Sequence, residues 1–100
     1  MTQLLWHPQA VSDRQAIVET LAEESEEIAL RWDQDLEGKL AQYATQPASL
    51  PAGRVPGTLE LVLLPHYVLV AQAPTAENPL TVLRILHTSK TWPEANSPLA

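Results

Sequence analysis

The chain has 100 residues, of which 45% are hydrophobic and 18% are charged, a balance typical of one folded domain with a single core. It contains no cysteine, which excludes disulfides, thiol catalysis and thiolate metal sites. No apolar stretch approaches the roughly 20 residues that cross a bilayer, and the first residues lack the basic and apolar regions of a secretory signal. We therefore expect a cytoplasmic protein that makes no contact with membranes.

The net charge of −6 is unevenly distributed. Residues 13–37 hold nine acids and two bases, whereas residues 38–100 hold three acids and four bases. Proteins that bind nucleic acids generally carry a basic patch that neutralises many phosphates. Four scattered bases do not form such a patch, so we expect no direct sequence-specific binding of nucleic acid.

The first half of the chain predicts a short strand followed by two helices. Residues 3–7 have the pattern of a strand that ends at Pro8. Ser12 is the predicted N-cap of the first helix, with Gln15 as its capping-box partner and Asp13 well placed against the helix dipole. Ser25 is the predicted N-cap of the second helix.

The second helix has a single apolar stripe with steps of three and four residues, which predicts the face that it buries. The stripe consists of Ile28, Trp32, Leu36, Leu40 and Tyr43. Pro47 and Pro51 end the helix. Since the break between the two helices is short, we expect them to pack as an antiparallel hairpin.

The second half predicts three strands. A loop rich in proline and glycine covers residues 46–57 and is followed by apolar runs at 58–64, 67–73 and 80–87, with turns of hairpin length between them. The predicted fold class is α+β in the order β-α-α-β-β-β, with a helical hairpin packed on a small, mostly antiparallel sheet. The pattern leaves open where the first strand joins the sheet. We expect one domain over residues 1–95 and a frayed tail over 96–100.

The end of the last predicted strand gathers groups that could bind a phosphate or act on one. Arg84, His87 and Lys90 lie within seven residues of one another, and histidine titrates near neutral pH. Alternation along the strand places Leu83 and His87 on one face and Arg84 on the other. The competing interpretation of His87 is a partly buried ring bonded to the backbone.

The other candidate residues suggest binding or plain structural roles. Arg54 and Glu60 could bind a partner or form a surface ion pair with each other. His66 and Tyr67 follow a hairpin turn, Trp92 before Pro93 is typical of an aromatic lid over one end of a core, and His7 is expected at the surface or as a cap. No phosphate-binding glycine loop, serine elbow or metal-binding histidine spacing occurs, so we expect no metal and no cofactor.

An ordered set of short motifs over residues 3–93 resembles the RelE/ParE superfamily of bacterial toxins from type II toxin–antitoxin systems. The set comprises Pro8, Ala10 and Asp13, then Ala29, Leu36 and Leu40, then Pro47, the run from Gly53 to Val62 (GRVPGTLELV), the run from Pro65 to Val70 (PHYVLV), the run from Val82 to His87 (VLRILH), and Trp92-Pro93. The 53–62 run and the Leu-His and Trp-Pro pairs are closer to the ParE branch. The resemblance implies the same α+β fold.

The resemblance also implies a toxin that inhibits growth and is neutralised by a cognate antitoxin. ParE-like members block DNA gyrase by binding, without known chemistry of their own. RelE-like members are metal-independent endoribonucleases that cut messenger RNA on the ribosome, and in that alternative Arg84, His87 and Lys90 would be catalytic. In the binding alternative Arg54, Glu60, His66, Tyr67 and Trp92 are the expected contact residues. A third alternative is a degenerate member that binds an antitoxin but is not toxic.

Two departures from the family pattern weigh against the endoribonuclease. Family members commonly have an arginine where this chain has Leu59, and a tyrosine where it has Ala71 and Gln72. An enzyme that works among ribosomal phosphates also needs strong positive charge, which a net charge of −6 opposes. The resemblance and the charge together favour a ParE-like binder that is not an enzyme.

Overall fold

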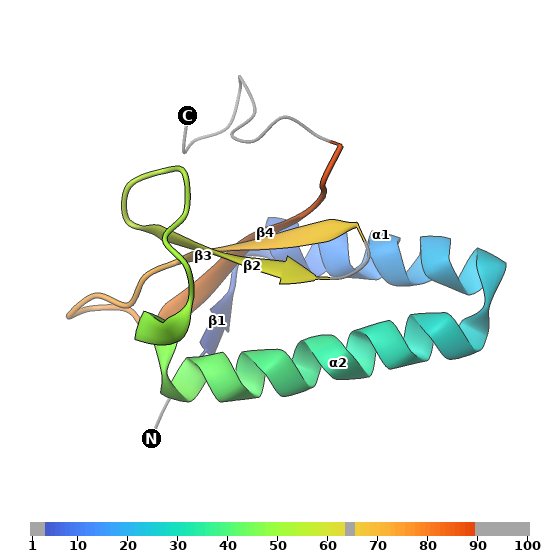
Figure 1. Ribbon diagram of the computed structural model, residues 1–100, viewed down its shortest axis with the longest axis horizontal. Coiled ribbons are helices and arrows are strands. Elements are labelled where there is room, and N and C mark those ends of the chain that lie inside the picture. The colour runs from blue at the N-terminus through green and yellow to red at the C-terminus, as the bar shows by residue number, and fades with distance from the viewer. Residues whose placement is uncertain (1–3, 64–65, 90–100) are drawn as a thin grey trace.

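The computed structural model describes residues 4–63 and 66–89 and contains two helices on one face of a four-stranded sheet (Figure 1). The elements are β1 (Leu4–Trp6), α1 (Pro8–Glu24), α2 (Glu26–Thr45), a 3-10 turn (Pro47–Ser49), β2 (Thr58–Leu63), β3 (Tyr67–Gln72) and β4 (Leu80–His87). The strand order is β1-β4-β3-β2. β1 pairs with β4 in parallel and the other pairs are antiparallel, so the predicted order and the mostly antiparallel sheet are confirmed.

The first helix begins five residues earlier than predicted. Its N-cap is His7, whose Nδ1 accepts a hydrogen bond from the Gln9 N–H at 3.1 Å, and Pro8 occupies the first helical position. Ser12 as the N-cap is therefore wrong. Proline at the first position has a suitable φ and lacks an N–H that would otherwise need a partner, which makes it the stronger start signal. The cap role expected for His7 is confirmed.

The second helix begins after Ser25, whose hydroxyl accepts the Ile28 N–H at 3.3 Å, as predicted. Its buried residues are Ala29, Trp32, Leu36, Leu40 and Ala44. Ile28 is 48% exposed, so its place in the predicted core stripe is wrong. Steps of four residues drift around a helix by about 40° each. The hairpin end of α2 extends past the end of the sheet (Figure 1), and Ile28 is not part of the main core cluster.

Arg14 ties β1, α1 and α2 together. Its Nε donates to Asp33 at 2.7 Å, its second terminal nitrogen donates to Glu37 at 2.6 Å, and its guanidinium lies 5.2 Å from the ring centre of Trp6. The hydrogen bond to Asp33 raises the pKa of Arg14, partial burial opposes this, and the bond to Glu37 adds to the rise. Two acids of the acidic segment, Asp33 and Glu37, are therefore paired with a base of the same segment.

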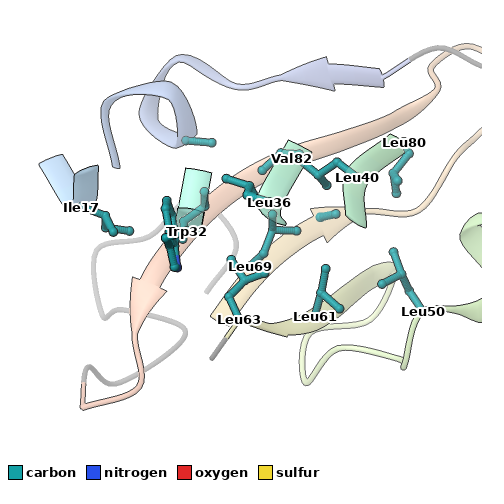
Figure 2. Close-up of a cluster of buried hydrophobic side chains, with 13 residues drawn as sticks. Ile17, Trp32, Leu36, Leu40, Leu50, Leu61, Leu63, Leu69, Leu80 and Val82 are labelled. Atoms are coloured by element: carbon teal, nitrogen blue, oxygen red, sulfur yellow. The ribbon is translucent and has the colours of Figure 1, made fainter. Parts of the chain in front are cut away.

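The main core lies between the helices and the sheet (Figure 2). Trp32, Leu36 and Leu40 of α2 and Ile17 of α1 pack against strand residues such as Leu69, which confirms the expected core position of Trp32. A smaller cluster of Val68, Val70 and Leu86 with Val55 covers the opposite face of the sheet.

β4 does not alternate regularly. A bulge opposite Val70 and Ala71 pairs Arg84 with Val70 but Val82 with Ala71, which leaves Leu83 between the two registers. Beyond the bulge, Ile85 and His87 share one face and Arg84 and Leu86 the other, as alternation predicts. The placement of Leu83 with His87 on one regular face is wrong, because the extra residue breaks the period of two.

The segment 46–57 is mostly a loop, as predicted, but it contains the 3-10 turn and packs along the outer edge of β2. The Gly53 N–H donates to the Thr58 carbonyl at 2.8 Å, and the Glu60 N–H donates to the Pro51 carbonyl at 3.0 Å. A Cβ at Gly53 would collide with the Thr58 hydroxyl, so only glycine fits there. Gly57 has a φ of +84°, which also favours glycine. The predicted tail 96–100 lies outside the described residues.

Candidate functional site

Three of the predicted site residues come together at one end of the sheet, and we name them the ring cluster: His66, Tyr67 and His87. The register pairs Tyr67 with His87, and the Thr88 N–H donates to the His66 carbonyl at 2.8 Å. The His87 ring centre lies 5.4 Å from that of Tyr67 in an edge-on contact, and 5.7 Å from that of His66. The ring centres of Trp32 and Tyr67 are 5.7 Å apart in an edge-on contact, so the ring cluster packs against the main core through Tyr67.

The hydrogen bonds of His87 assign its tautomer. The backbone N–H of Ser89 donates to Nδ1 at 3.0 Å, and the Ser89 hydroxyl lies 2.7 Å from the same atom. A ring nitrogen that accepts a backbone N–H carries no proton, so the proton of the neutral ring is on Nε2. His87 can therefore donate a hydrogen bond from Nε2, whereas its basic lone pair is already in use. This arrangement suits a binding residue better than a general base.

A cleft opens beside the ring cluster, between α1 and the end of β4, and we name it the α1–β4 cleft. Its volume is about 210 Å³. It is lined by Asp13, Ala16, Ile17 and Thr20 from α1 and by Tyr67, Ile85, Leu86 and His87 from the sheet. Its lining residues combine apolar side chains with two that carry hydroxyls, one carboxylate and one imidazole. Such a cleft can receive one apolar side chain of a partner and hydrogen-bond its neighbours.

The Arg84 guanidinium binds the carboxylate of Asp13 on α1. Its Nε donates to Asp13 at 2.8 Å and its terminal nitrogen to the other carboxylate oxygen at 3.3 Å. Both side chains are less than one-fifth exposed. The Ile85 N–H also donates to Asp13, at 3.0 Å. The role of Arg84, His87 and Lys90 at a phosphate stays a prediction, and in the structure the carboxylate of α1 binds the Arg84 guanidinium.

Arg54 and Glu60 form a forked ion pair at the opposite edge of the sheet. The Arg54 side chain donates to Glu60 at 3.0 and 3.1 Å, and the Arg54 backbone N–H donates at 2.9 Å. Burial of the Glu60 carboxyl raises its pKa, but these hydrogen bonds outweigh it and leave the pKa below its ordinary value. The pair closes the loop before β2 onto that strand, which is the structural role weighed above.

The remaining predicted site residues, Lys90 and Trp92, lie outside the described residues. Asp13, which bonds Arg84 and lines the α1–β4 cleft, was predicted only as a helix-dipole residue. No local signal could have found this contact, since Asp13 and Arg84 are 71 residues apart. Within residues 4–63 and 66–89, no three His, Asp or Glu side chains gather as metal ligands would, and no helix is long and apolar enough to span a membrane.

Comparison with known proteins gives one family and a set of structures. Residues 4–92 match the family model of the ParE toxin of type II toxin–antitoxin systems, parDE. Among solved structures, the chromosomal ParDE toxin–antitoxin system from P. aeruginosa contains a chain with a TM-score of 0.72 to this one. That chain is 22% identical, and the match covers 87% of this chain and 96% of that one. No curated protein sequence matches significantly.

Proposed function

The chain belongs to the ParE toxins of type II toxin–antitoxin systems, and from that premise we propose that it arrests growth by binding DNA gyrase and is held silent by a cognate antitoxin. The observation that carries the proposal is the family match over residues 4–92. The fold shared with the ParDE structure supports it. The toxin acts in the cytoplasm, where its target is found, and it needs no metal or cofactor.

The charge arrangement supports binding rather than RNA cleavage. An endoribonuclease must offer cations to the phosphate that it attacks. Here Arg84 bonds Asp13 and Arg54 bonds Glu60, so an RNA phosphate would have to compete with a carboxylate for either guanidinium. The lone pair of His87 at Nδ1 is taken by Ser89. A protein target, in contrast, can use the apolar and hydrogen-bonding walls of the α1–β4 cleft.

The composition of the ring cluster favours one competing function, that of a RelE-like endoribonuclease. His66, Tyr67 and His87 gather at one strand end, and Lys90 follows closely in sequence. In that function His87 would donate a proton from Nε2 to a leaving group, and Lys90 would neutralise the phosphate. The two functions differ in what happens to messenger RNA.

Induced expression without the antitoxin distinguishes the alternatives. We expect growth arrest, induction of the SOS response and intact transcripts by primer extension, since gyrase inhibition damages DNA and leaves messenger RNA uncut. Discrete cuts in transcripts without an SOS response would instead establish the endoribonuclease. Normal growth together with retained antitoxin binding would identify a non-toxic member of the family.

The acidic helical hairpin predicts the chemistry of the antitoxin. Residues 13–37 carry a net charge of −7, and most of the acids in this segment are exposed. Antitoxin segments that fold on the toxin commonly begin disordered. We expect the segment that crosses these helices to be rich in lysine or arginine, and the affinity to fall as salt is raised from about 0.05 to 0.5 M. An affinity that does not change with salt would contradict this expectation.

A further inference from the structure

A second, smaller cleft opens between α2 and the end of β2, and we name it the α2–β2 cleft. Its volume is about 150 Å³, and it is lined by Trp32, Asp35, Leu36 and Lys39 from α2 and by Leu63 from β2. Leu36 and Leu63 are buried core residues and give the cleft apolar walls. The other three residues supply an indole N–H, a carboxylate and an ammonium group.

The indole N–H of Trp32 has no hydrogen-bond acceptor within residues 4–63 and 66–89. The residue is only 7% exposed, so water has little access to it. Figure 2 shows the indole nitrogen at the end of the ring nearer Leu63, which is a wall of the cleft. A buried indole N–H usually has a partner, because a buried donor without one costs the free energy of its desolvation. This donor therefore indicates that a ligand supplies the acceptor.

Lys39 gives the cleft a second donor. Its side chain is partly buried, and among the described residues it forms no ion pair, although Asp35 lies one turn before it on α2. Asp35 is exposed, so water weakens its repulsion of another negative charge. Two donors at one cleft, one of them positively charged, match an anionic acceptor.

A carboxylate matches these donors better than a phosphate does. One carboxylate oxygen can accept the Trp32 N–H and the other can accept from the Lys39 ammonium. The methylene groups of an aspartate or glutamate side chain would contact the apolar walls. The additional oxygens of a phosphate would face those walls or the Asp35 carboxylate, which is unfavourable.

The α2–β2 cleft lies next to the ring cluster. Leu63 pairs with Tyr67 in the register of β2 and β3, and the ring centres of Trp32 and Tyr67 are 5.7 Å apart. Tyr67 also lines the α1–β4 cleft. Both clefts therefore border Tyr67 at one end of the sheet, where a single partner surface can contact both.

Charge indicates which partner supplies the carboxylate. The antitoxin segment is expected to be cationic, so its chemistry does not match this cleft. A second copy of this protein would bring another net charge of −6 and would be repelled. We propose that the α2–β2 cleft binds the carboxylate of an aspartate or glutamate side chain of gyrase, with its oxygens at Trp32 Nε1 and Lys39 Nζ. The inference rests on the proposed function for the identity of that target.

Titration of the full-length chain with acetate tests the site, and acetamide is the uncharged control. The signal is the Trp32 indole N–H resonance in a heteronuclear NMR spectrum, assigned through its contact with the Tyr67 ring. Acetate should move this resonance downfield until the shift saturates, because the N–H then donates to a carboxylate. Lys39→Met should raise the half-saturating acetate concentration at least about tenfold. No shift, an equal shift with acetamide, or saturation by inorganic phosphate at lower concentrations than acetate overturns the inference.

Inhibition of purified gyrase tests the partner. Lys39→Met keeps the apolar stem and removes the ammonium, so the concentration that half-inhibits supercoiling should rise at least about tenfold. Lys39→Arg retains the charge and should stay within about threefold of the parent. Arg31→Met is the matched control, because it removes one positive charge from an exposed position of the same helix; it should leave inhibition unchanged. All three variants should keep the parent's affinity for the antitoxin, which shows that they fold.

The outcomes separate this inference from the proposed function. Full inhibition by Lys39→Met, or equal losses in Lys39→Met and Arg31→Met, overturns the inference and leaves the proposed function standing. A parent chain that does not inhibit gyrase overturns the proposed function and gyrase as the source of the carboxylate. In that case the acetate titration still supports or refutes the site itself.

Discussion

The two edges of the sheet are closed in different ways. The outer edge of β2 is closed by main-chain pairing: Ala52 forms a β-bridge with Leu59, and two backbone hydrogen bonds join the segment 51–53 to the strand. On the outer edge of β4, past the residues that pair with β1, the Asp13 carboxylate of α1 accepts a hydrogen bond from the Ile85 N–H. A closed main-chain pairing excludes further partners, whereas a side chain covers only one of the available groups. The difference is that main-chain pairing closes the β2 edge, whereas among the described residues no strand lies beside β4 beyond Val82 on its outer side.

Each edge also has an arginine–carboxylate pair, and the two pairs differ in their origin. Arg54 and Glu60 are six residues apart, whereas Asp13 and Arg84 are 71 apart. The first pair closes a local loop. The second pair fixes α1 against the sheet and is the more buried of the two at the arginine, which is 15% exposed against 53% for Arg54. We therefore expect the remote pair to matter more for the stability of the whole domain.

The largest expected effect comes from Asp13→Ala. The change removes the carboxylate that bonds both Arg84 and the Ile85 N–H, and it leaves a largely buried guanidinium without this counter-charge. The free energy of unfolding should fall by about 2–3 kcal/mol, measured by urea denaturation at neutral pH. The matched control is Asp35→Ala, an exposed acid on α2, which should stay within about 0.5 kcal/mol of the parent. Equal effects at the two positions would show that Asp13 does not anchor the β4 edge.

The next effect tests the closed edge at β2. Gly53→Ala places a Cβ against the Thr58 hydroxyl and backbone, so the loop must move away from the strand, at a cost of about 1–2 kcal/mol. Gly38→Ala is the matched control, because nothing lies near its added Cβ and alanine favours a helix; it should raise stability by about 0.5–1 kcal/mol. Thermal and urea unfolding of both variants measure whether each substitution lowers or raises the free energy of unfolding. A neutral Gly53→Ala would mean that the loop is not held tightly on β2.

The smallest effect is a pH dependence from the local pair. Because the pKa of Glu60 in the folded chain lies below its ordinary 4.5, its ion pair adds stability above that pH, and the gain is lost as the pH falls through the lowered value. Glu60→Gln should therefore be less stable than the parent by up to about 1 kcal/mol at pH 7. The difference should shrink toward zero in the most acidic buffers. A difference that is constant over this range would contradict the pairing.

Much of the fold could be predicted from the sequence because its signals are local. The β-branched and leucine-rich runs between turn residues gave strands whose ends agree with the structure to within a residue or two. The Ser25 cap lies just before a regular apolar stripe, which is a strong helix signal. The errors have local causes as well. Pro8 is a stronger helix-start signal than Ser12. Ile28 is exposed, near the end of α2 that extends past the sheet (Figure 1).

The site was harder to predict because its contacts are remote. Tyr67 and His87 meet through strand register, which hairpin turns can suggest but a bulge can shift by one residue. The Asp13–Arg84 pair joins elements at opposite ends of the chain, and no spacing reveals it. His87 was recognised as a candidate from its residue type and from Arg84 and Lys90 nearby in the sequence. Its tautomer, which decides whether it donates or accepts, depends on the position of the Ser89 N–H.

Binding of gyrase is the central step in the proposed action of this toxin. The most direct measurement is the supercoiling of relaxed plasmid by purified gyrase, with the purified chain added and then titrated with the antitoxin. We expect the chain to inhibit supercoiling at concentrations close to that of the enzyme, and an equimolar amount of antitoxin to restore it. Full supercoiling activity in the presence of excess folded chain would contradict the account.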